Sequence, residues 1–466
     1  MEKIHDAFST VFDLLAAASS ILLFAPAFGQ AAEPEVLSAD EALAIDAKHY
    51  AASYGVSVEE AAVRLLIMHE SGEQIAQIAQ RHRDRLSGIY FDNSDDFGLA
   101  VRVTGSQAPP NEHLVRRPST LPPRATGRVP GGLAQKLGLT EGDIDAARSA
   151  MGREISREVR YRAQARNTRQ QRAAKQDQTR AALLADPQIE MIADDERTGE
   201  AIVYVRQADE ATRAKVAAAL GDEFRLVEIP TGIVPTHSRG GSKLRRRSDN
   251  GLVCMTAFPV KQNFTSIYGA VTAGHCLDPV YGALKYADKA DGYVYDVTSE
   301  SNWRFDSSYD LGWISANHHI TNQFYADSGT AARTVTSYAN RLYDTRVKSA
   351  TVTGSYICHL GQTSKTNESL VQSCGEVTSV TGGSQLGGNT YVVVSNTQSG
   401  AGTTRTSGLG TLRCVRGDSG GPWFANTVAY GVQSACSWTD SSETTAVTVV
   451  YTSVDFISQL DVQIQY

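Results

Sequence analysis

Hydrophobic and polar residues follow two different patterns along the chain. Before about residue 235, Ala, Leu and Ile recur at helical spacing, and two Ser-x-x-Glu capping boxes, at residues 38–41 and 57–60, predict the starts of two helices. From residue 251 onward, short runs of Val, Ile, Thr, Tyr and Phe are broken by Gly, Ser, Asn and Asp, with almost no helical periodicity before residue 453. This second pattern predicts an all-β barrel or sandwich.

The N-terminal part of the chain is expected to hold two small α+β modules. In the first, at about residues 38–105, the two helices precede a hairpin over residues 89–103. In the second, at about residues 186–230, a β-β-α-β order is expected. Between them, residues 153–180 are rich in Arg, Gln and Ala, which predicts an exposed helix or linker. Neither module carries a catalytic set of residues.

Composition divides the chain at the same place. All six Cys and all four Trp lie after residue 250, whereas only 29 of the 95 charged residues lie from Ser248 to the end. Such different chemistry is typical of separate units, and we expect their boundary near residues 236–250, which include the basic run at residues 243–247. The net charge of -7 gives no reason to expect nucleic-acid binding, and residues 153–180 lack interleaved aromatic residues.

The N-terminus has features of an export signal. Residues 14–28 form an apolar run that is shorter than the ~20 residues a membrane-spanning helix needs. Small residues follow, and they fit cleavage near residue 27 or 31. Lys3 is the only fixed positive side chain before the run, so a buried N-terminal helix is the alternative. The even number of Cys favours an oxidising compartment. We therefore expect a signal peptide at residues 1–31 and a secreted, extracellular product without stable membrane insertion.

Three segments of the C-terminal part carry candidate chemistry. His275 lies in Val-Thr-Ala-Gly-His-Cys, Asp310 directly precedes an apolar strand, and Ser419 lies in the Gly-rich turn Gly-Asp-Ser-Gly-Gly-Pro. A serine hydroxyl needs a base to take its proton, a neutral imidazole suits that role, and a buried carboxylate orients the imidazole. The three residues together therefore predict acyl transfer. The backbone N–H groups of Gly417 and Ser419 are the expected donors to the developing oxyanion.

The motifs Thr-Ala-Gly-His-Cys and Gly-Asp-Ser-Gly-Gly-Pro, in this order, resemble those of the chymotrypsin-fold serine peptidases. Within that family the chain looks most like the bacterial streptogrisin and alpha-lytic protease branch. The resemblance covers residues 240–466 well and residues 32–239 more loosely. It implies two six-stranded antiparallel β-barrels with a short C-terminal helix, near residues 454–460, preceded by an α+β pro-region.

By this resemblance His275, Asp310 and Ser419 form the catalytic triad, and Ser434 lies beside the substrate-binding strand. Asp306 is the rival acid, but Asp310 is preferred because it directly precedes an apolar strand, whereas Asp306 lies in a polar turn. Six Cys allow fifteen connectivities. Nearest-neighbour pairing resembles the family's bridges and predicts these disulfides: Cys254–Cys276, Cys358–Cys374 and Cys414–Cys436.

The resemblance implies a zymogen. Residues 240–466 are the expected serine endopeptidase domain. Residues 32–239 are the expected pro-region, which assists the folding of that domain and inhibits its activity. We expect protein or peptide substrates, the pro-region as an intramolecular partner, a monomer, and no nucleic acid, metal or cofactor. The acids Asp288, Asp291 and Asp296 are interpreted as solvated loop residues rather than a calcium site.

Two departures from the family pattern affect activation and specificity. The chain lacks an Ile-Val-Gly-Gly sequence before the mature domain, so Asp418 is not assumed to pair with a new N-terminus. Leu412 and Arg413, nearest the expected pocket base, are not acidic, which favours a preference for non-basic side chains. One alternative is a peptidase-fold binding or adhesion protein without activity. The other is a Ser-triad esterase of another fold, in which the serine, acid and histidine follow one another in a different order along the chain.

Overall fold

The structure is a computed structural model, and the chain from Pro34 to Tyr466 forms one compact unit. The described residues are 37–118, 137–230, 234–235, 241–287, 294–299, 303–305, 309–316, 321–327, 332–340, 349–364, 367–384, 387–395, 411–438 and 445–466. The expected signal peptide therefore lies outside them. Within these ranges, the helices are all too short or too polar to cross a membrane. We call residues 37–235 the N-terminal half and residues 241–466 the C-terminal half.

The first two helices begin where the capping boxes predict. Ser38 caps α1 (Ala39–Tyr54) and Ser57 caps α2 (Val58–Glu70), each by accepting a hydrogen bond from a backbone N–H three residues on. The predicted hairpin is also present, as β1 (Leu86–Asp92) and β2 (Gly98–Thr104). Further elements that the sequence pattern did not predict complete this module: α3 (Gly72–Arg81), β3 (Glu112–Arg116), α5 (Glu141–Gly152) and β4 (Ile155–Ala165).

The Arg-rich segment, residues 153–180, differs from the expected exposed helix or linker. Its first part is β4, which lies between β2 and β3 in a four-stranded sheet of order β1-β2-β4-β3. Its second part belongs to α6 (Arg169–Leu184). Helix propensity is a weak prior, and it is overridden here because Ile155, Val159 and Tyr161 bury their side chains in the sheet.

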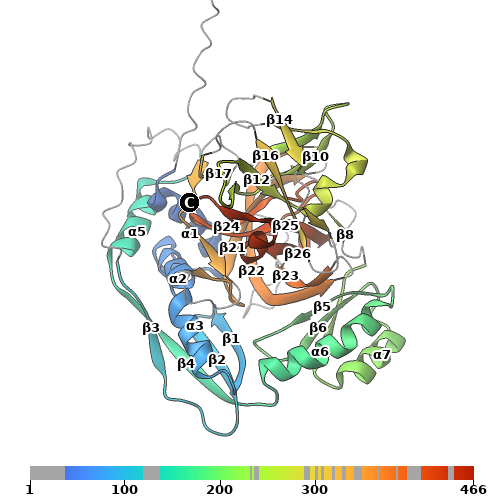
Figure 1. Cartoon of the computed structure of the whole chain (residues 1–466). Coiled ribbons are helices and arrows are strands. Elements are labelled where there is room, and N and C mark those ends of the chain that lie inside the picture. Colours follow the sequence, from blue (N-terminus) through green and yellow to red (C-terminus); the bar gives the residue numbers. More distant parts are fainter. Residues whose placement is uncertain are drawn as a thin grey trace, which may run out of the picture. The chain divides into compact units, whose positions relative to one another are not determined.

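The second module has the predicted β-β-α-β order. It consists of β5 (Ile189–Asp194), β6 (Ala201–Val205), α7 (Glu210–Leu220) and β7 (Phe224–Glu228). Figure 1 shows α6 and α7 beside β5 and β6. Strand β5 also pairs antiparallel with β22 (Asn367–Ser384) of the C-terminal half. The two halves therefore share one sheet.

The first part of the C-terminal half is a curved antiparallel sheet. Its strands run in the order β10-β9-β13-β14-β16-β12-β11-β27, and β15 pairs with β16. The strands are β9 (Lys243–Arg246), β10 (Leu252–Met255), β11 (Pro259–Gln262), β12 (Tyr268–Thr272), β13 (Leu284–Ala287), β14 (Val294–Ser299), β15 (Arg304–Phe305), β16 (Asp310–Ala316) and β27 (Val462–Ile464). Most of the basic run at residues 243–247, at the expected boundary, thus belongs to strand β9.

The second part is a closed barrel of six strands, because pairing runs from β21 through β22, β23, β26, β25 and β24 back to β21. Besides β22, these are β21 (Tyr356–Ser364), β23 (Gly387–Ser395), β24 (Pro422–Ala425), β25 (Val428–Trp438) and β26 (Ala446–Ser453). The short remaining strands are β8 (Val234–Pro235), β17 (Gln323–Tyr325), β18 (Ala332–Thr334), β19 (Ser337–Asn340) and β20 (Ser349–Ala350).

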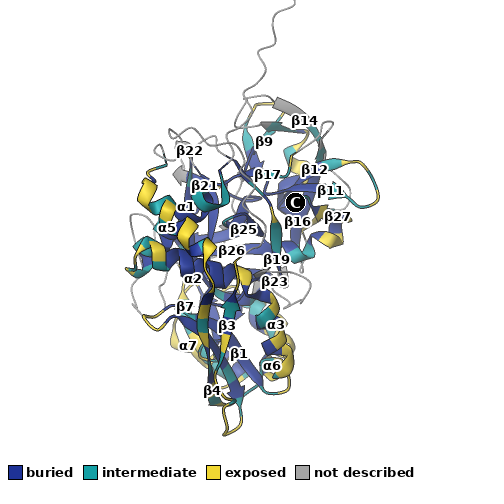
Figure 2. Cartoon of the chain, turned by 90° about the vertical axis from the view of Figure 1, so that its left-hand side faces the viewer, coloured by how far each residue is buried: buried dark blue, intermediate teal, exposed yellow. Residues whose placement is uncertain are grey.

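The predicted fold class is confirmed: strands dominate the C-terminal half, and an α+β region precedes it. The expected C-terminal helix is the 3-10 helix η3 (Val454–Leu460), and two further short 3-10 helices are η1 (Gly274–Leu277) and η2 (Pro279–Tyr281). Every residue of β25 is buried, and the ribbon beside its label is dark blue in Figure 2. The core therefore lies against the strands that carry the candidate site.

Candidate active site

His275 and Asp310 are brought together by the first sheet. His275 lies on η1, directly after β12, and Asp310 is the first residue of the neighbouring strand β16. The His275 Nδ1 atom lies 2.8 Å from Asp310 Oδ2, and the His275 backbone N–H donates to Asp310 Oδ1 at 2.9 Å. Because a carboxylate can only accept these bonds, Nδ1 carries the ring proton. Both side chains are buried, so the imidazole is held in one orientation.

Ser434 connects this pair to Ser419. The Ser434 hydroxyl donates to Asp310 Oδ2, which makes it a further donor to the carboxylate. The Ser419 hydroxyl in turn donates to the main-chain oxygen of Ser434 at 3.1 Å. Both serines are fully buried. The structure thus brings together His275, Asp310, Ser419 and Ser434, all of which the sequence singled out.

The turn that carries Ser419 depends on glycine at two positions. Gly417 has φ +116°, a conformation that side-chain-bearing residues rarely adopt. Gly420 has φ +85°, and a Cβ atom there would lie 2.1 Å from the carbonyl oxygen of Met255. The close approach matters because the Met255 N–H donates to the Ser419 carbonyl at 3.0 Å. The turn is therefore fixed against β10.

Asp418 is fully buried inside the same turn. Its carboxylate accepts hydrogen bonds from the backbone N–H groups of Val415, at 2.8 Å, and Gln362, at 3.0 Å. These bonds stabilise the turn without a new N-terminus. Sequence reasoning missed Gln362, because it lies 56 residues before Asp418 and belongs to no motif.

The main chain near the predicted pocket base has its own support. His359 Nε2 lies 2.6 Å from the carbonyl oxygen of Arg413, and the Arg413 N–H donates to the Ser373 hydroxyl at 3.1 Å. Burial lowers the pKa of His359 to about 4, so the ring is neutral near pH 7. The His359 ring also stacks on Trp423, with centroids 4.6 Å apart. His359 was not predicted, since Arg413 lies 54 residues further along the chain.

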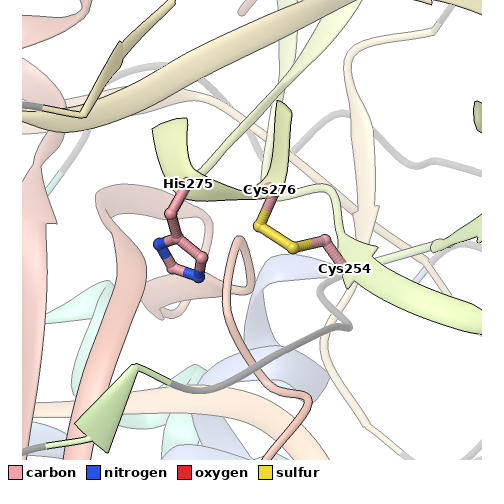
Figure 3. A group of neighbouring side chains, drawn as sticks. All are labelled: Cys254, His275 and Cys276. Atoms are coloured by element: carbon pink, nitrogen blue, oxygen red, sulfur yellow. A yellow bond between two sulfur atoms is a disulfide. The ribbon is translucent and has the colours of Figure 1, made fainter. Parts of the chain in front are cut away.

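The three predicted disulfides are present, with Cα–Cα distances of 5.6 Å for Cys254–Cys276, 3.9 Å for Cys358–Cys374 and 6.4 Å for Cys414–Cys436. Figure 3 shows the Cys254–Cys276 bridge beside His275. These three side chains have ligand-type atoms within 4.8 Å of one another. A metal site requires thiolates, however, and both sulfurs are consumed by the disulfide, so the group does not fit a metal centre.

Some sequence-based candidates lie outside the described residues. These are the rival acid Asp306 and two of the loop acids, Asp288 and Asp291. Asp296 lies on β14. A feature that the sequence did not predict lies close to Ser434: strand β8 of the N-terminal half pairs antiparallel with β25 at Ala435 and Cys436.

Comparison with known proteins identifies the C-terminal half. Residues 246–460 match the family model for trypsin. None of the curated proteins matches the chain. Among solved structures the chain is similar to a glutamic acid specific serine protease (22% identity, TM-score 0.33, 48% of this chain and 99% of that one). It is also similar to the Nocardiopsis protease (19%, 0.33, 49% and 98%) and to the Cellulomonas bogoriensis chymotrypsin (20%, 0.32, 49% and 97%). Residues 246–460 are therefore a domain of the trypsin family, and the chain is a serine endopeptidase.

Proposed function

We propose that the chain is the precursor of a secreted endopeptidase in which Ser419 is the nucleophile, His275 the general base and Asp310 the orienting acid. Residues 32–239 are its pro-region in this proposal, and residues 240–466 the enzyme. The observation that carries the proposal is the chain of contacts from Ser419 through Ser434 and Asp310 to His275. Membership of β9 in the C-terminal sheet supports a cut before Lys243.

The geometry supports acyl transfer. With the proton of His275 on Nδ1, the Nε2 lone pair takes the proton of the Ser419 hydroxyl, and Oγ attacks the carbonyl carbon of the peptide. Negative charge then develops on the carbonyl oxygen, where the N–H groups of Gly417 and Ser419 are the proposed donors. His275 returns the proton to the leaving amine as the C–N bond breaks. Water repeats the sequence on the acyl-enzyme and releases the second product.

Strand β8 supports an inhibitory role for the pro-region. It pairs with β25 at Ala435 and Cys436, directly after Ser434. Extended peptides bind proteins by adding a strand to an available sheet edge. Because β8 already pairs with this part of β25, a substrate peptide would have to displace it. We therefore infer that the pro-region blocks substrate until residues 234–235 leave.

A folding role has a separate physical basis. Barrels of long-range pairings fold slowly, because loop closure precedes the favourable contacts. The β5–β22 pairing offers a preformed edge on which the second barrel can assemble. The test is refolding of residues 240–466 with and without residues 32–239 added in trans. Equal yields would contradict the folding role and leave the catalytic proposal intact.

The nucleophile is tested by intact-mass analysis of secreted protein treated with a fluorophosphonate. We expect one adduct on a fragment that starts near residue 240, absent in Ser419→Ala and present in the matched control Ser458→Ala, which changes an exposed serine. A full-length chain in Ser419→Ala alone would indicate self-processing. If the processed, folded wild type forms no adduct, the chain is a peptidase-fold binding or adhesion protein instead.

Export is tested on the same sample. N-terminal sequencing of the secreted Ser419→Ala protein, which keeps its pro-region, is expected to give a start after residue 27 or 31. Retention of residues 1–26 in the secreted protein would contradict the predicted signal peptide.

A further inference from the structure

The carboxylate of Asp46, on α1, is buried against the C-terminal half. Its Oδ1 atom accepts hydrogen bonds from the Gln372 amide at 2.7 Å and from Arg333 at 3.1 Å. Its Oδ2 atom accepts from the backbone N–H of Asn426 at 2.6 Å and from Arg333 at 3.2 Å. Only 1% of Asp46 is exposed. One acid of the N-terminal half is therefore bound by three residues of the C-terminal half.

Arg333, on β18, is fully buried. Besides Asp46, its guanidinium donates to Gln372 Oε1 and to the Asn426 carbonyl, both at 3.1 Å, and it lies 5.0 Å from the centre of the Phe424 ring. A buried cation is costly unless an anion compensates its charge, and Asp46 is that anion here. The C-terminal half thus carries a positive charge whose partner belongs to the N-terminal half.

Glu376, on β22, shows the reverse arrangement. It is 2% exposed and accepts a hydrogen bond from the Asn93 amide at 2.9 Å. The Tyr54 hydroxyl also donates to it, and the Arg197 guanidinium forms an ion pair with it. These donors come from the end of α1, the β1–β2 turn and the β5–β6 turn. Burial, reinforced by the nearby Glu376, raises the pKa of Tyr54 well above its usual range, so the hydroxyl keeps its proton and donates.

We propose that Arg333 and Glu376 form a two-point recognition surface by which the C-terminal half selects and retains its own pro-region after the connecting chain is cut. The inference rests on the proposed zymogen function and adds its recognition chemistry. A segment is accepted when it presents a carboxylate to Arg333 and a cation with hydrogen-bond donors to Glu376. A segment with the wrong sign at either place leaves a buried charge without a partner, which is strongly unfavourable.

The burial of both pairs has a consequence for ionic strength. Salt screens exposed charges effectively but buried pairs much less. Retention of the cut pro-region is therefore expected to change little between low salt and about 0.5 M salt. Ordinary surface attraction between the halves would instead weaken steeply.

The experiment uses the full chain with an introduced site for an external protease within residues 236–240, and with Ser419→Ala to prevent self-cleavage. After cutting, dissociation of the two fragments is followed by size exclusion over a dilution series. Asp46→Asn and Glu376→Gln are each expected to raise the Kd on the order of 100-fold, the loss typical of removing one partner of a buried pair. The matched control Glu60→Gln, which removes two ion pairs internal to the N-terminal half, is expected to change the Kd less than threefold.

A double variant keeps the test informative if a single variant folds poorly. The double variant Asp46→Asn with Arg333→Gln removes both charges of one pair. Its Kd is therefore expected to rise far less than the product of the rises caused by Asp46→Asn alone and by Arg333→Gln alone. Changes below threefold in Asp46→Asn and Glu376→Gln, matching the control, would overturn the recognition surface. If the cut wild-type fragments separate at once, the pro-region proposal itself fails. This outcome differs from variants that bind as tightly as the control, which would overturn only the recognition surface.

Discussion

Acid is expected to destabilise the precursor through three buried histidines. Burial lowers the pKa of His49, His69 and His359 from 6.5 to about 4. His49 also faces Asp46, which opposes the shift, and Arg333 and Lys48, which reinforce it. In the unfolded chain each ring has its ordinary pKa, so between pH 6.5 and pH 4 the unfolded state binds more protons than the folded state. The free energy of unfolding therefore falls as the pH falls through this window.

The magnitude follows from the two pKa values. At pH 5 a histidine of the unfolded chain is almost fully protonated, whereas a buried one with a pKa of about 4 remains mostly neutral. This difference lowers the free energy of unfolding by about 2 kcal/mol per residue. Three such residues give a loss of about 6 kcal/mol relative to pH 8, comparable with the whole stability of many domains. Below pH 4 both states are protonated, and this contribution stops growing.

The assay is urea unfolding of the full-length Ser419→Ala protein at pH 8 and pH 5. Replacing His69 by Gln is expected to reduce the difference between the two pH values by about a third, since one of three groups no longer titrates. His113→Gln, which changes an exposed histidine, is the control and is expected to leave the difference unchanged. An equal pH dependence in wild type and His69→Gln would refute the reasoning.

Further predictions concern the catalytic half. Asp310→Asn is expected to lower kcat about 10⁴-fold, because the imidazole loses its orienting carboxylate, with an unchanged circular dichroism spectrum; a loss below tenfold would reassign the acid. Gly420→Ala is expected to abolish activity because its Cβ would lie 2.1 Å from the Met255 oxygen, whereas Gly152→Ala, with open space around it, is expected to be neutral in the same peptidase assay. A peptide-library profile is expected to show weak cleavage after Lys or Arg; efficient cleavage after Arg would contradict this.

The sequence was most informative where local rules decide structure. The capping boxes located α1 and α2, hydrophobic alternation located the β1–β2 hairpin, and cysteine spacing with the family resemblance gave the three disulfides. The motifs around His275 and Ser419 singled out residues that the fold brings together. These features depend on a few neighbouring residues, so a single sequence carries them.

Contacts between distant segments could not be predicted in the same way. Asp46 and Arg333 lie 287 residues apart, and neither sits in a motif. Strand β4 was hidden by the helix propensity of its Arg, Gln and Ala residues, although its buried positions decide its structure. The pairing of β5 with β22 depends on where two modules meet. Such contacts are set by packing of the whole unit, which local propensity does not encode.

The shared contacts imply that the two halves of the precursor unfold together. The Tyr356 hydroxyl, in the C-terminal half, lies 2.7 Å from the Ser53 hydroxyl of α1, and the Tyr356 ring packs edge-on against Tyr50. Asp46 of α1 compensates the charge of the buried Arg333, and Arg197 of the β5–β6 turn compensates that of the buried Glu376. Separating the halves would therefore open apolar core and leave charged groups without their partners at the same moment. The N-terminal half is consequently part of the folding unit of the precursor, and its removal changes the stability of the enzyme as well as access to it.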